Sequence, residues 1–240
     1  GALHLLLEAY ARVDALDPGL AADVRSLVGF TVTKKSVLAE GERLEDRWWI
    51  LGEVVEEEED LIARRTWLMG QKSGRPALIL DFAPPMGALP PSLPGGLALD
   101  GEVAFYASAH PQRGLLVPRP DEHGEAVLPS PRADARAGPL GRHLMDLQAA
   151  WRKRAAARER QPWLRRDLVA LRGLRPGRRE AAAVLVDEGG RGLELDAGEA
   201  AFWGLVAIGG GGPVDVWGEL EGRTLRPLAA LSGDRLDVLG

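Results

Sequence analysis

Alternating apolar and polar positions are clearest between residues 47 and 71, where they predict a β-hairpin. Trp48, Ile50 and Val54 fall on one face of the first strand, and the return strand is expected over residues 61–69. A period of two is the pattern of a half-buried strand. The turn between the strands is predicted at an acidic run, whose like charges favour an exposed tip: Glu56, Glu57, Glu58, Glu59 and Asp60.

Further strands are predicted from short β-branched and apolar runs separated by turn residues. These runs lie at residues 30–33, 76–83, 97–108, 113–118, 181–186, 192–195, 201–208, 214–220 and 223–231. The run at 76–83 is apolar almost throughout, which predicts a central strand buried on both faces. Glu221-Gly222 predicts a two-residue hairpin turn. No convincing internal repeat is visible along the chain.

Helical spacing of apolar residues occurs in two parts of the chain. Residues 2–13 and 18–28 predict two short amphipathic helices, which together resemble the tail of a larger helical region. In the second part, Leu140, Leu144 and Trp151 predict a helix that runs to about residue 160 and places Trp151 in the core. Another turn or two of helix is expected over residues 163–171.

These elements predict a β-rich α+β protein with antiparallel sheets or small barrels and with N-terminal and central helices. Proline-rich and charged segments suggest the boundaries between its parts. The predicted parts are a helical segment at 1–28, an antiparallel β domain at 29–118, a Pro-rich linker at 119–138, basic amphipathic helices at 139–178 and a C-terminal β unit at 179–240.

Composition excludes several classes of protein and site. No run approaches the roughly eighteen apolar residues of a transmembrane helix, so no membrane partner is expected. The 240 residues include no cysteine, which excludes disulfides, thiolate nucleophiles and cysteine-based metal sites within this chain. The first residues have no signal-peptide pattern and no initiator methionine, which suggests a cytoplasmic protein given as a fragment.

Charge is unevenly distributed along the chain. The net charge is −5, yet the segment from Pro139 to Glu180 contains twelve basic and four acidic residues. Two interpretations are open: these arginines pair with the protein's own acidic surface, or they bind nucleic acid, with Trp151 and Trp163 as stacking partners. The candidate contact residues in this segment are Arg152, Lys153, Arg154, Arg158, Arg165 and Arg166.

Chemical motifs are sparse. The four histidines have no metal-ligand spacing, and no serine lies in a nucleophile motif, so neither a metal site nor a catalytic residue is predicted. A buried charge is expected at Asp81, which ends an apolar run and therefore needs a cationic partner. Arg64, Arg65 and Arg113 are the candidates for that partner on neighbouring strands.

Several segments resemble the region beyond the zinc finger in bacterial SWIM zinc finger family proteins. They are Asp46–Gly52, Arg64–Gly70, Ser73–Ala83, Val103–Arg113 and Val216–Leu228. The resemblance extends over most of residues 5–231, although the motifs themselves have no known chemistry. The finger of this family is a Cys-x-Cys…Cys-x-His zinc site, and a chain without cysteine lacks it. Zinc is therefore implied only for the absent finger, and no cofactor is expected here.

The resemblance implies a place beside a MoxR-type AAA+ ATPase and a von Willebrand factor A (vWA) domain protein, which are encoded in the same gene clusters. The leading hypothesis is a non-enzymatic adaptor that docks such protein partners, with the acidic tip and the arginines as contact surfaces. The alternative is nucleic-acid binding through the Arg-rich segment at 142–179. An unrecognised hydrolase is the third hypothesis.

Overall fold

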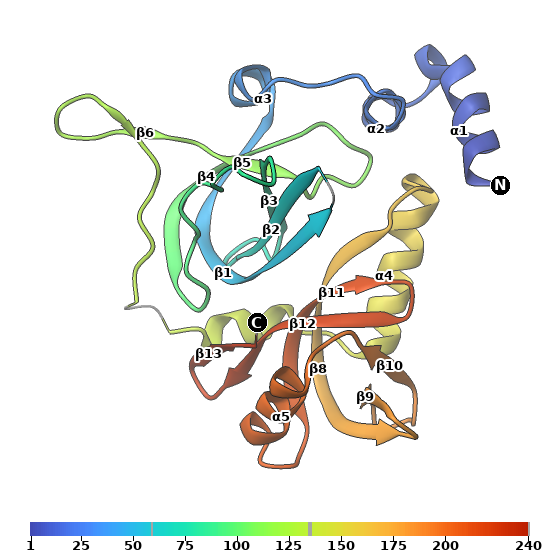
Figure 1. Ribbon diagram of the computed structural model, residues 1–240, viewed down its shortest axis with the longest axis vertical. Coiled ribbons are helices and arrows are strands. Elements are labelled where there is room, and N and C mark those ends of the chain that lie inside the picture. The colour runs from blue at the N-terminus through green and yellow to red at the C-terminus, as the bar shows by residue number, and fades with distance from the viewer. Residues whose placement is uncertain (59, 134–135, 240) are drawn as a thin grey trace.

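The computed structural model describes residues 1–58, 60–133 and 136–239 as a β-rich α+β protein (Figure 1). Three helices come first, and two sets of antiparallel strands follow, separated by a small ribbon and a helix. The helices are α1 (Ala2–Ala11), α2 (Pro18–Leu27), α3 (Lys34–Glu40), α4 (Leu147–Arg160) and α5 (Glu199–Ile208), with 3₁₀ turns at Val13–Ala15 and Gly138–His143.

The first sheet closes into a small barrel, here called barrel 1. Its strands are β1 (Glu42–Glu58), β2 (Leu61–Gly70), β3 (Pro76–Ala83), β4 (Ala98–Phe105) and β5 (Gly114–Leu116), in the order β3-β2-β1-β4-β5. A parallel bridge between Leu78 and Arg113 joins the two edges, and the Leu78 N–H donates to the Gln112 carbonyl at 2.8 Å. The interior is filled by Trp48, Ile50, Leu68, Ala77, Leu99, Val103, Phe105 and Leu116.

The second sheet closes in the same way and forms barrel 2. Its strands are β8 (Arg166–Arg179), β9 (Ala182–Val186), β10 (Gly192–Leu195), β11 (Val214–Glu221) and β12 (Thr224–Ser232), with β13 (Arg235–Val238) added beside β12. Parallel pairing of β10 with β12 closes the barrel. Its apolar core includes Leu147 and Ala150 of α4, so this helix covers part of the barrel.

Both barrels have one topology. In each, a long first strand pairs with the second and the fourth strands, and the third strand meets the fifth in parallel. This is the strand order of the OB-fold, a five-stranded Greek-key barrel. Helix α5 lies between the third and fourth strands of barrel 2, where barrel 1 has the proline-rich segment 84–97. The chain thus repeats a topology that its sequence does not reveal.

The two barrels are neighbours in the fold (Figure 1). Their outer faces pack together through a third apolar cluster, here called the barrel interface. Its members include Trp49, Leu51, Trp67 and Met69 from barrel 1 and Leu168, Ala170, Trp217, Leu228 and Ala229 from barrel 2. Alternate residues of β1 therefore face the interior of barrel 1 and the interface. This double burial explains why tryptophans stand side by side at positions 48 and 49.

The predicted hairpin is confirmed, but a bulge changes its faces. The register between β1 and β2 shifts between Ile50 and Gly52, and Gly52 has a φ of 150°. An extra residue in one strand moves the following side chains to the opposite face. Val54 consequently packs at the barrel interface with Trp49 and Leu51, whereas the alternation predicted it beside Trp48.

Three predicted elements are wrong, each in a short segment. Residues 30–33 form no strand; Thr33 instead caps α3, accepting the Ser36 N–H at 3.1 Å. Residues 166–171 belong to strand β8, not to a helix, because Val169 and Leu171 face the interior of barrel 2 while Leu168 and Ala170 face the interface. Residues 201–208 belong to α5 instead of a strand. A short apolar run does not by itself distinguish helix from strand.

Strand β3 is also not the fully buried central strand that its sequence predicts. It lies at one end of the sheet order, and Phe82 is 49% exposed.

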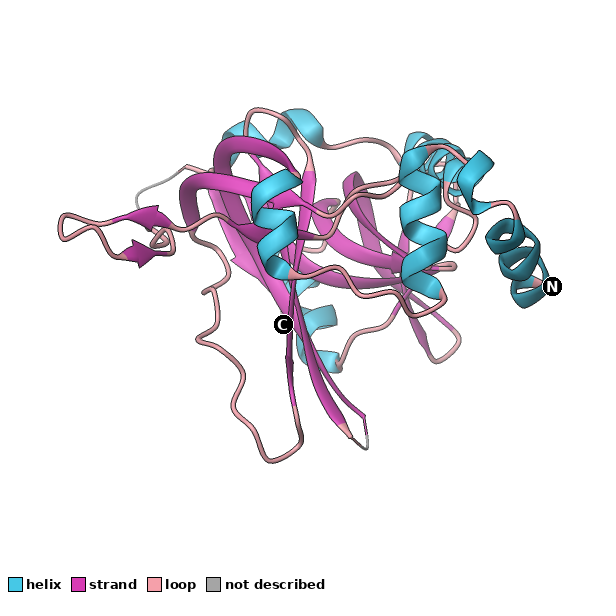
Figure 2. Cartoon of the chain, turned by 90° about the horizontal axis from the view of Figure 1, so that it is seen from above, coloured by secondary structure: helices cyan, strands magenta, loops and turns pink. Residues whose placement is uncertain are grey.

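In the segment predicted as a linker, the ribbon β6 (Arg119–Pro120) and β7 (Ala126–Val127) extends from the barrels (Figure 2). None of the helices in the described part of the chain is both long and apolar enough to cross a membrane.

Candidate functional site

A network of charged side chains lies between the barrels, toward the turn end of the β1–β2 hairpin. Its centre is the ion pair of Arg65 on β2 with Glu219 on β11, in which Arg65 Nε donates to Glu219 Oε2 at 2.9 Å and Nη2 donates to Oε1 at 3.0 Å. The indole nitrogen of Trp67 donates to the same carboxylate at 2.7 Å. Arg65 and Glu219 are both buried. The pair therefore connects the two barrels in a region from which water is largely excluded.

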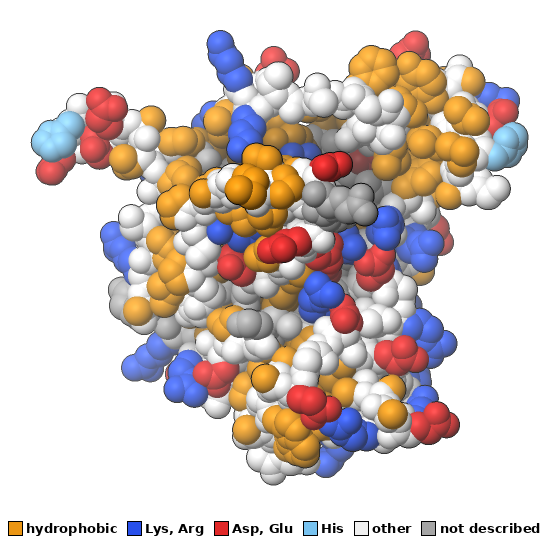
Figure 3. Space-filling view, in the orientation of Figure 1, with side chains coloured by type: hydrophobic (Ala, Val, Ile, Leu, Met, Phe, Trp, Pro, Cys, Tyr) orange, Lys and Arg blue, Asp and Glu red, His pale blue; other side chains and the backbone are white. Residues whose placement is uncertain are grey.

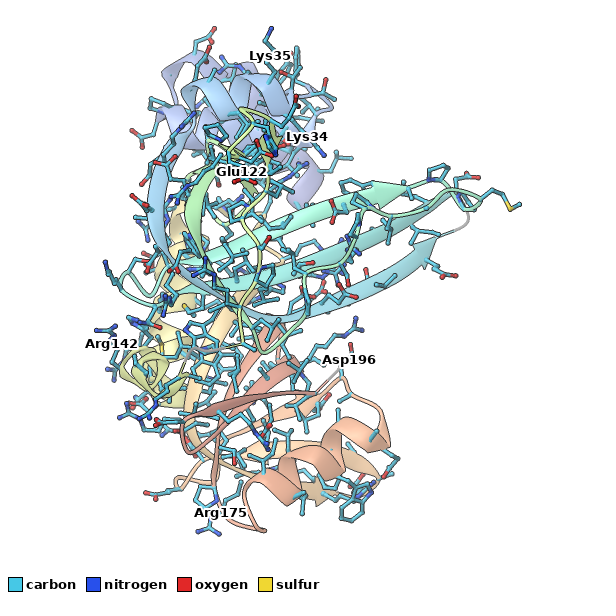
Figure 4. All side chains as sticks on the ribbon, turned by 90° about the vertical axis from the view of Figure 1, so that its left-hand side faces the viewer. Lys34, Lys35, Glu122, Arg142, Arg175 and Asp196 are labelled. Carbon is cyan, nitrogen blue, oxygen red and sulfur yellow. The ribbon has the colours of Figure 1, made fainter. Side chains whose placement is uncertain are left out.

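Other members of the network surround this pair. Glu56 accepts two hydrogen bonds from Arg65, both at 2.8 Å. Arg166 contacts Glu56, Glu219 and Glu221, and Arg226 contacts Glu56 and Asp196. A cavity of about 230 Å³ lies among these side chains. Asp196, labelled in Figure 4, is on the side of barrel 2 that faces the hairpin.

The electrostatics of the network favour charged, paired groups. The hydrogen bonds from Arg65 lower the pKa of the Glu56 carboxyl to about 2, and the charges of Arg166 and Arg226 contribute further. The hydrogen bond to Glu56 also raises the pKa of the Arg65 guanidinium above its ordinary value. A general base needs a lone pair that can reach a substrate. Here both Glu219 oxygens already accept from Arg65, so the network acts as a cross-link between barrels.

Stability should depend on pH through Glu56. The pKa of this carboxyl falls from 4.5 to about 2 on folding, so its stabilising contribution is present above pH 4.5 and is lost as pH falls toward 2. Glu56→Gln is expected to lower the urea midpoint at about pH 6, and this deficit should shrink as pH approaches 2. Glu57→Gln, at the exposed neighbouring position, is the control for losing one carboxylate. If Glu56→Gln lowers the urea midpoint as much near pH 2 as at pH 6, the stabilising role assigned to the Glu56 carboxylate is wrong.

The predicted acidic tip is only partly a free surface. Glu56 belongs to the network just described, while Glu57 and Asp60 are exposed. The backbone of Glu58 continues β1, and Glu59 lies outside the described residues. The hairpin that carries this tip extends away from the body of the protein (Figure 2).

The basic candidates divide into paired and exposed groups. Arg154 is buried, donates to the carbonyls of Leu220 at 2.6 Å and Arg165 at 2.7 Å, and has its pKa lowered by burial. Arg165 and Arg166 both donate to Glu221. The exposed basic residues of α4 are Arg152, Lys153, Arg158 and Arg160. Much of the positive charge in this segment is thus balanced by the protein's own carboxylates and carbonyls.

The expected buried charges have identifiable partners. Asp81 accepts from Arg64 at 2.7 Å, and Arg64 also donates to the Pro90 carbonyl at 2.8 Å. The guanidinium of Arg113 instead lies 4.2 Å from the centre of the Tyr106 ring. Glu219, the most deeply buried carboxylate of the network, was missed because only the packing of the two barrels brings it to Arg65. Its sequence signal was a glutamate within a strand that also carries Val214, Val216, Trp217 and Leu220.

An exposed apolar surface covers the N-terminal helices. Of the sixteen large hydrophobic residues exposed in the described chain, eight lie within the first 32 residues. Figure 3 shows hydrophobic side chains gathered over α1 and its neighbourhood. We call the members that form one stripe the N-terminal apolar face: Leu3, Leu7, Tyr10 and Phe30. The Tyr10 and Phe30 rings are 6.3 Å apart, so this face joins α1 to the segment after α2.

Comparison with known proteins adds no assignment. No family model, no curated protein and no solved structure matches this chain. Within the described residues, no three His, Asp or Glu side chains are grouped as possible metal ligands.

Proposed function

We propose that this protein is a non-enzymatic adaptor that docks a protein partner on its N-terminal apolar face. The observation that carries the proposal is the exposure of that face: Leu3 is 71% exposed, Leu7 57% and Phe30 57%. Contiguous exposed apolar surface of this kind is typical of interaction sites. The side chains of the charged network between the barrels pair with one another. We therefore assign the network to holding the barrels together, and docking to the apolar face.

The geometry of α1 indicates what kind of partner it would accept. Leu3, Leu7 and Tyr10 have the i, i+4, i+7 spacing that places side chains on one face of a helix. No residue of α1 is buried, and a bond from Trp163 Nε1 to the Ala2 carbonyl, at 3.3 Å, connects the helix to the rest of the chain. The helix contains one carboxylate, Glu8. An apolar segment of another protein, with few charges of its own, fits this surface.

By the family resemblance, the candidate partners are a MoxR-type AAA+ ATPase and a vWA-domain protein. Biolayer interferometry with these purified proteins from the same organism would test the proposal. We expect wild type to bind one of them and L3S/L7S/Y10S to weaken binding at least about tenfold, because buried apolar anchors dominate docking energies.

The matched control is M86S/V127S/L128S, which removes three exposed apolar side chains far from α1 in sequence and should bind as wild type does. Circular dichroism must show that both variants are folded. Equal binding by L3S/L7S/Y10S and wild type rejects the docking face. Failure of wild type to bind either protein rejects this choice of partners.

Nucleic-acid binding is the second candidate, supported by the exposed basic residues of α4 and by the OB-type topology, which in other proteins can bind oligonucleotides. It ranks lower because Arg154, Arg165 and Arg166 are used within the protein. In fluorescence anisotropy with DNA and RNA, micromolar binding at about 50 mM salt that weakens sharply at about 200 mM would favour this alternative.

A further inference from the structure

A second cavity lies where three parts of the chain meet. It has a volume of about 230 Å³ and is bounded by α2, by the loop between β4 and β5, and by residues 161–164 before β8. Its apolar walls include Val32, Leu78 and Leu164. We call it the junction pocket. Because its walls come from the N-terminal helices and from both barrel regions, it exists only in the assembled fold.

One side of the junction pocket carries a buried carboxylate. Asp23 of α2 is 8% exposed and accepts the Ala109 N–H at 2.8 Å. Burial raises the pKa of the Asp23 carboxyl above its ordinary value, although interactions with the Ala109 N–H, Ser108, His110 and Gln161 partly oppose this rise. The charged form of Asp23 is therefore incompletely compensated, and a cation beside it would be stabilised.

Two amide side chains that line the pocket have unused acceptors. Gln112 is 8% exposed, and its nitrogen donates to the Arg166 carbonyl at 3.2 Å, which fixes the orientation of the amide. Gln161 lines the same pocket and acts on the Asp23 carboxyl. The Oε1 atoms of Gln112 and Gln161 are both buried and have no hydrogen-bond partner among the described residues. Buried acceptors without donors are unfavourable, so a ligand that supplies N–H groups would gain from both.

We propose that the junction pocket binds a cationic N–H donor, namely a guanidinium or primary ammonium group on a short apolar stem. The N–H groups would bond the free amide oxygens, the positive charge would lie beside Asp23, and the stem would contact Val32, Leu78 and Leu164. This inference does not depend on the docking function proposed above.

An anionic ligand fits less well, although two potential cations border the pocket. The guanidinium of Arg113 lies over the Tyr106 ring, and His110 Nε2 is 3.4 Å from Asp167 Oδ1. Asp167 is 3% exposed, so His110 has a buried carboxylate as its neighbour. A bound anion would face Asp23 and would leave the acceptors of Gln112 and Gln161 without donors.

The position in the fold supports a binding role independently of these side chains. The loop between the fourth and fifth strands is one of the two loops that contribute most to ligand binding in OB-folds. In barrel 1 this loop contains Ser108, His110 and Gln112, all of which line the junction pocket. The shared topology thus points to the loop that carries Gln112, one of the two amides with an unpaired oxygen.

Isothermal titration of the full chain with n-butylguanidinium and with its neutral analogue n-butylurea tests the proposal. We expect n-butylguanidinium to bind with a Kd below about 10 mM, and n-butylurea to bind at least about tenfold more weakly. An acetylated tripeptide with a central arginine distinguishes the source of the group. Tighter binding of the peptide indicates an arginine of a partner protein, and preference for n-butylguanidinium indicates a free small molecule.

Two variants locate the binding. Asp23→Asn removes the charge and should weaken binding about tenfold, while Ala22→Leu fills the pocket without removing a polar contact and should abolish it. Asp14→Asn, at a carboxylate whose side chain is 91% exposed, is the matched control and should bind normally. Because Asp23→Asn also loses a structural acceptor, thermal melting must first show that it folds. Undetectable binding of n-butylguanidinium, equal binding of n-butylurea, or normal binding by Ala22→Leu overturns the proposal.

Discussion

Replacing Arg65 with alanine is expected to lower the free energy of unfolding by about 3–5 kcal/mol, because it leaves a buried carboxylate without its partner. Glu219 is 4% exposed and accepts two hydrogen bonds from Arg65. After the substitution, the Trp67 indole would still donate to this carboxylate, and Arg166 would remain 3.5 Å away. Neither contact replaces the paired bonds of the guanidinium. Urea denaturation followed by circular dichroism measures the loss.

The matched control is Arg235→Ala. Arg235 also pairs with a carboxylate, Asp237, at 2.7 Å, but its side chain is 77% exposed. Exposed ion pairs contribute about 0–1 kcal/mol, so this variant should be close to wild type. If Arg65→Ala cost less than about 1 kcal/mol as well, the Arg65–Glu219 pair would not be a structural link between the barrels.

Replacing Trp217 with alanine is expected to cost about 3–5 kcal/mol, the usual range for removing a large aromatic side chain from a core. Trp217 is fully buried at the barrel interface, between residues of both barrels. Its indole nitrogen has no hydrogen-bond partner among the described residues, so the loss should come from packing alone. Because the interface cluster includes side chains of both barrels, we expect wild type and variant each to unfold in a single urea transition.

Trp203→Ala is the control for removing a tryptophan. Trp203 on α5 is 56% exposed, and its replacement should cost less than about 1 kcal/mol. Trp217→Phe should recover much of the stability lost in Trp217→Ala, since it restores an aromatic ring and loses no hydrogen bond. Two separate transitions in wild type would show that the barrels are stable independently, and would contradict the role assigned to the interface.

Local patterns predicted many of the elements, and particular residues show why. The alternation around Trp48 and the turn at Glu221-Gly222 were recognisable because each depends on neighbouring residues: β1, β2, β11 and β12 lie where strands were expected. Asp81, which is half-buried, contacts Arg64, one of the candidate partners named from the sequence. These features are encoded within a few positions, or across one hairpin.

The predictions of secondary structure failed where both faces of a strand are buried, because the alternation of apolar and polar residues is then lost. Residues 168–171 of β8 are apolar on both faces, since one face packs inside barrel 2 and the other against barrel 1. The Gly52 bulge likewise moved Val54 to the interface in a way that strict alternation does not anticipate. In the candidate site, Glu56 was assigned to an exposed tip although its main partner, Arg65, lies only nine residues away. The acidic run hid this pairing, and the further contact with Arg226 spans 170 positions.

Local sequence patterns predicted the β-rich character, the principal hairpin and the segregation of basic from acidic residues, and the composition excluded cysteine chemistry within this chain. The closure of ten strands into two barrels of one topology, and the pairing of particular charges, became visible only in the folded protein. The two sets of features differ in the range of the interactions on which they depend. A turn or an alternating strand depends on residues close in the chain, whereas Arg65 meets Glu219 across 154 positions only after both barrels have closed and packed together.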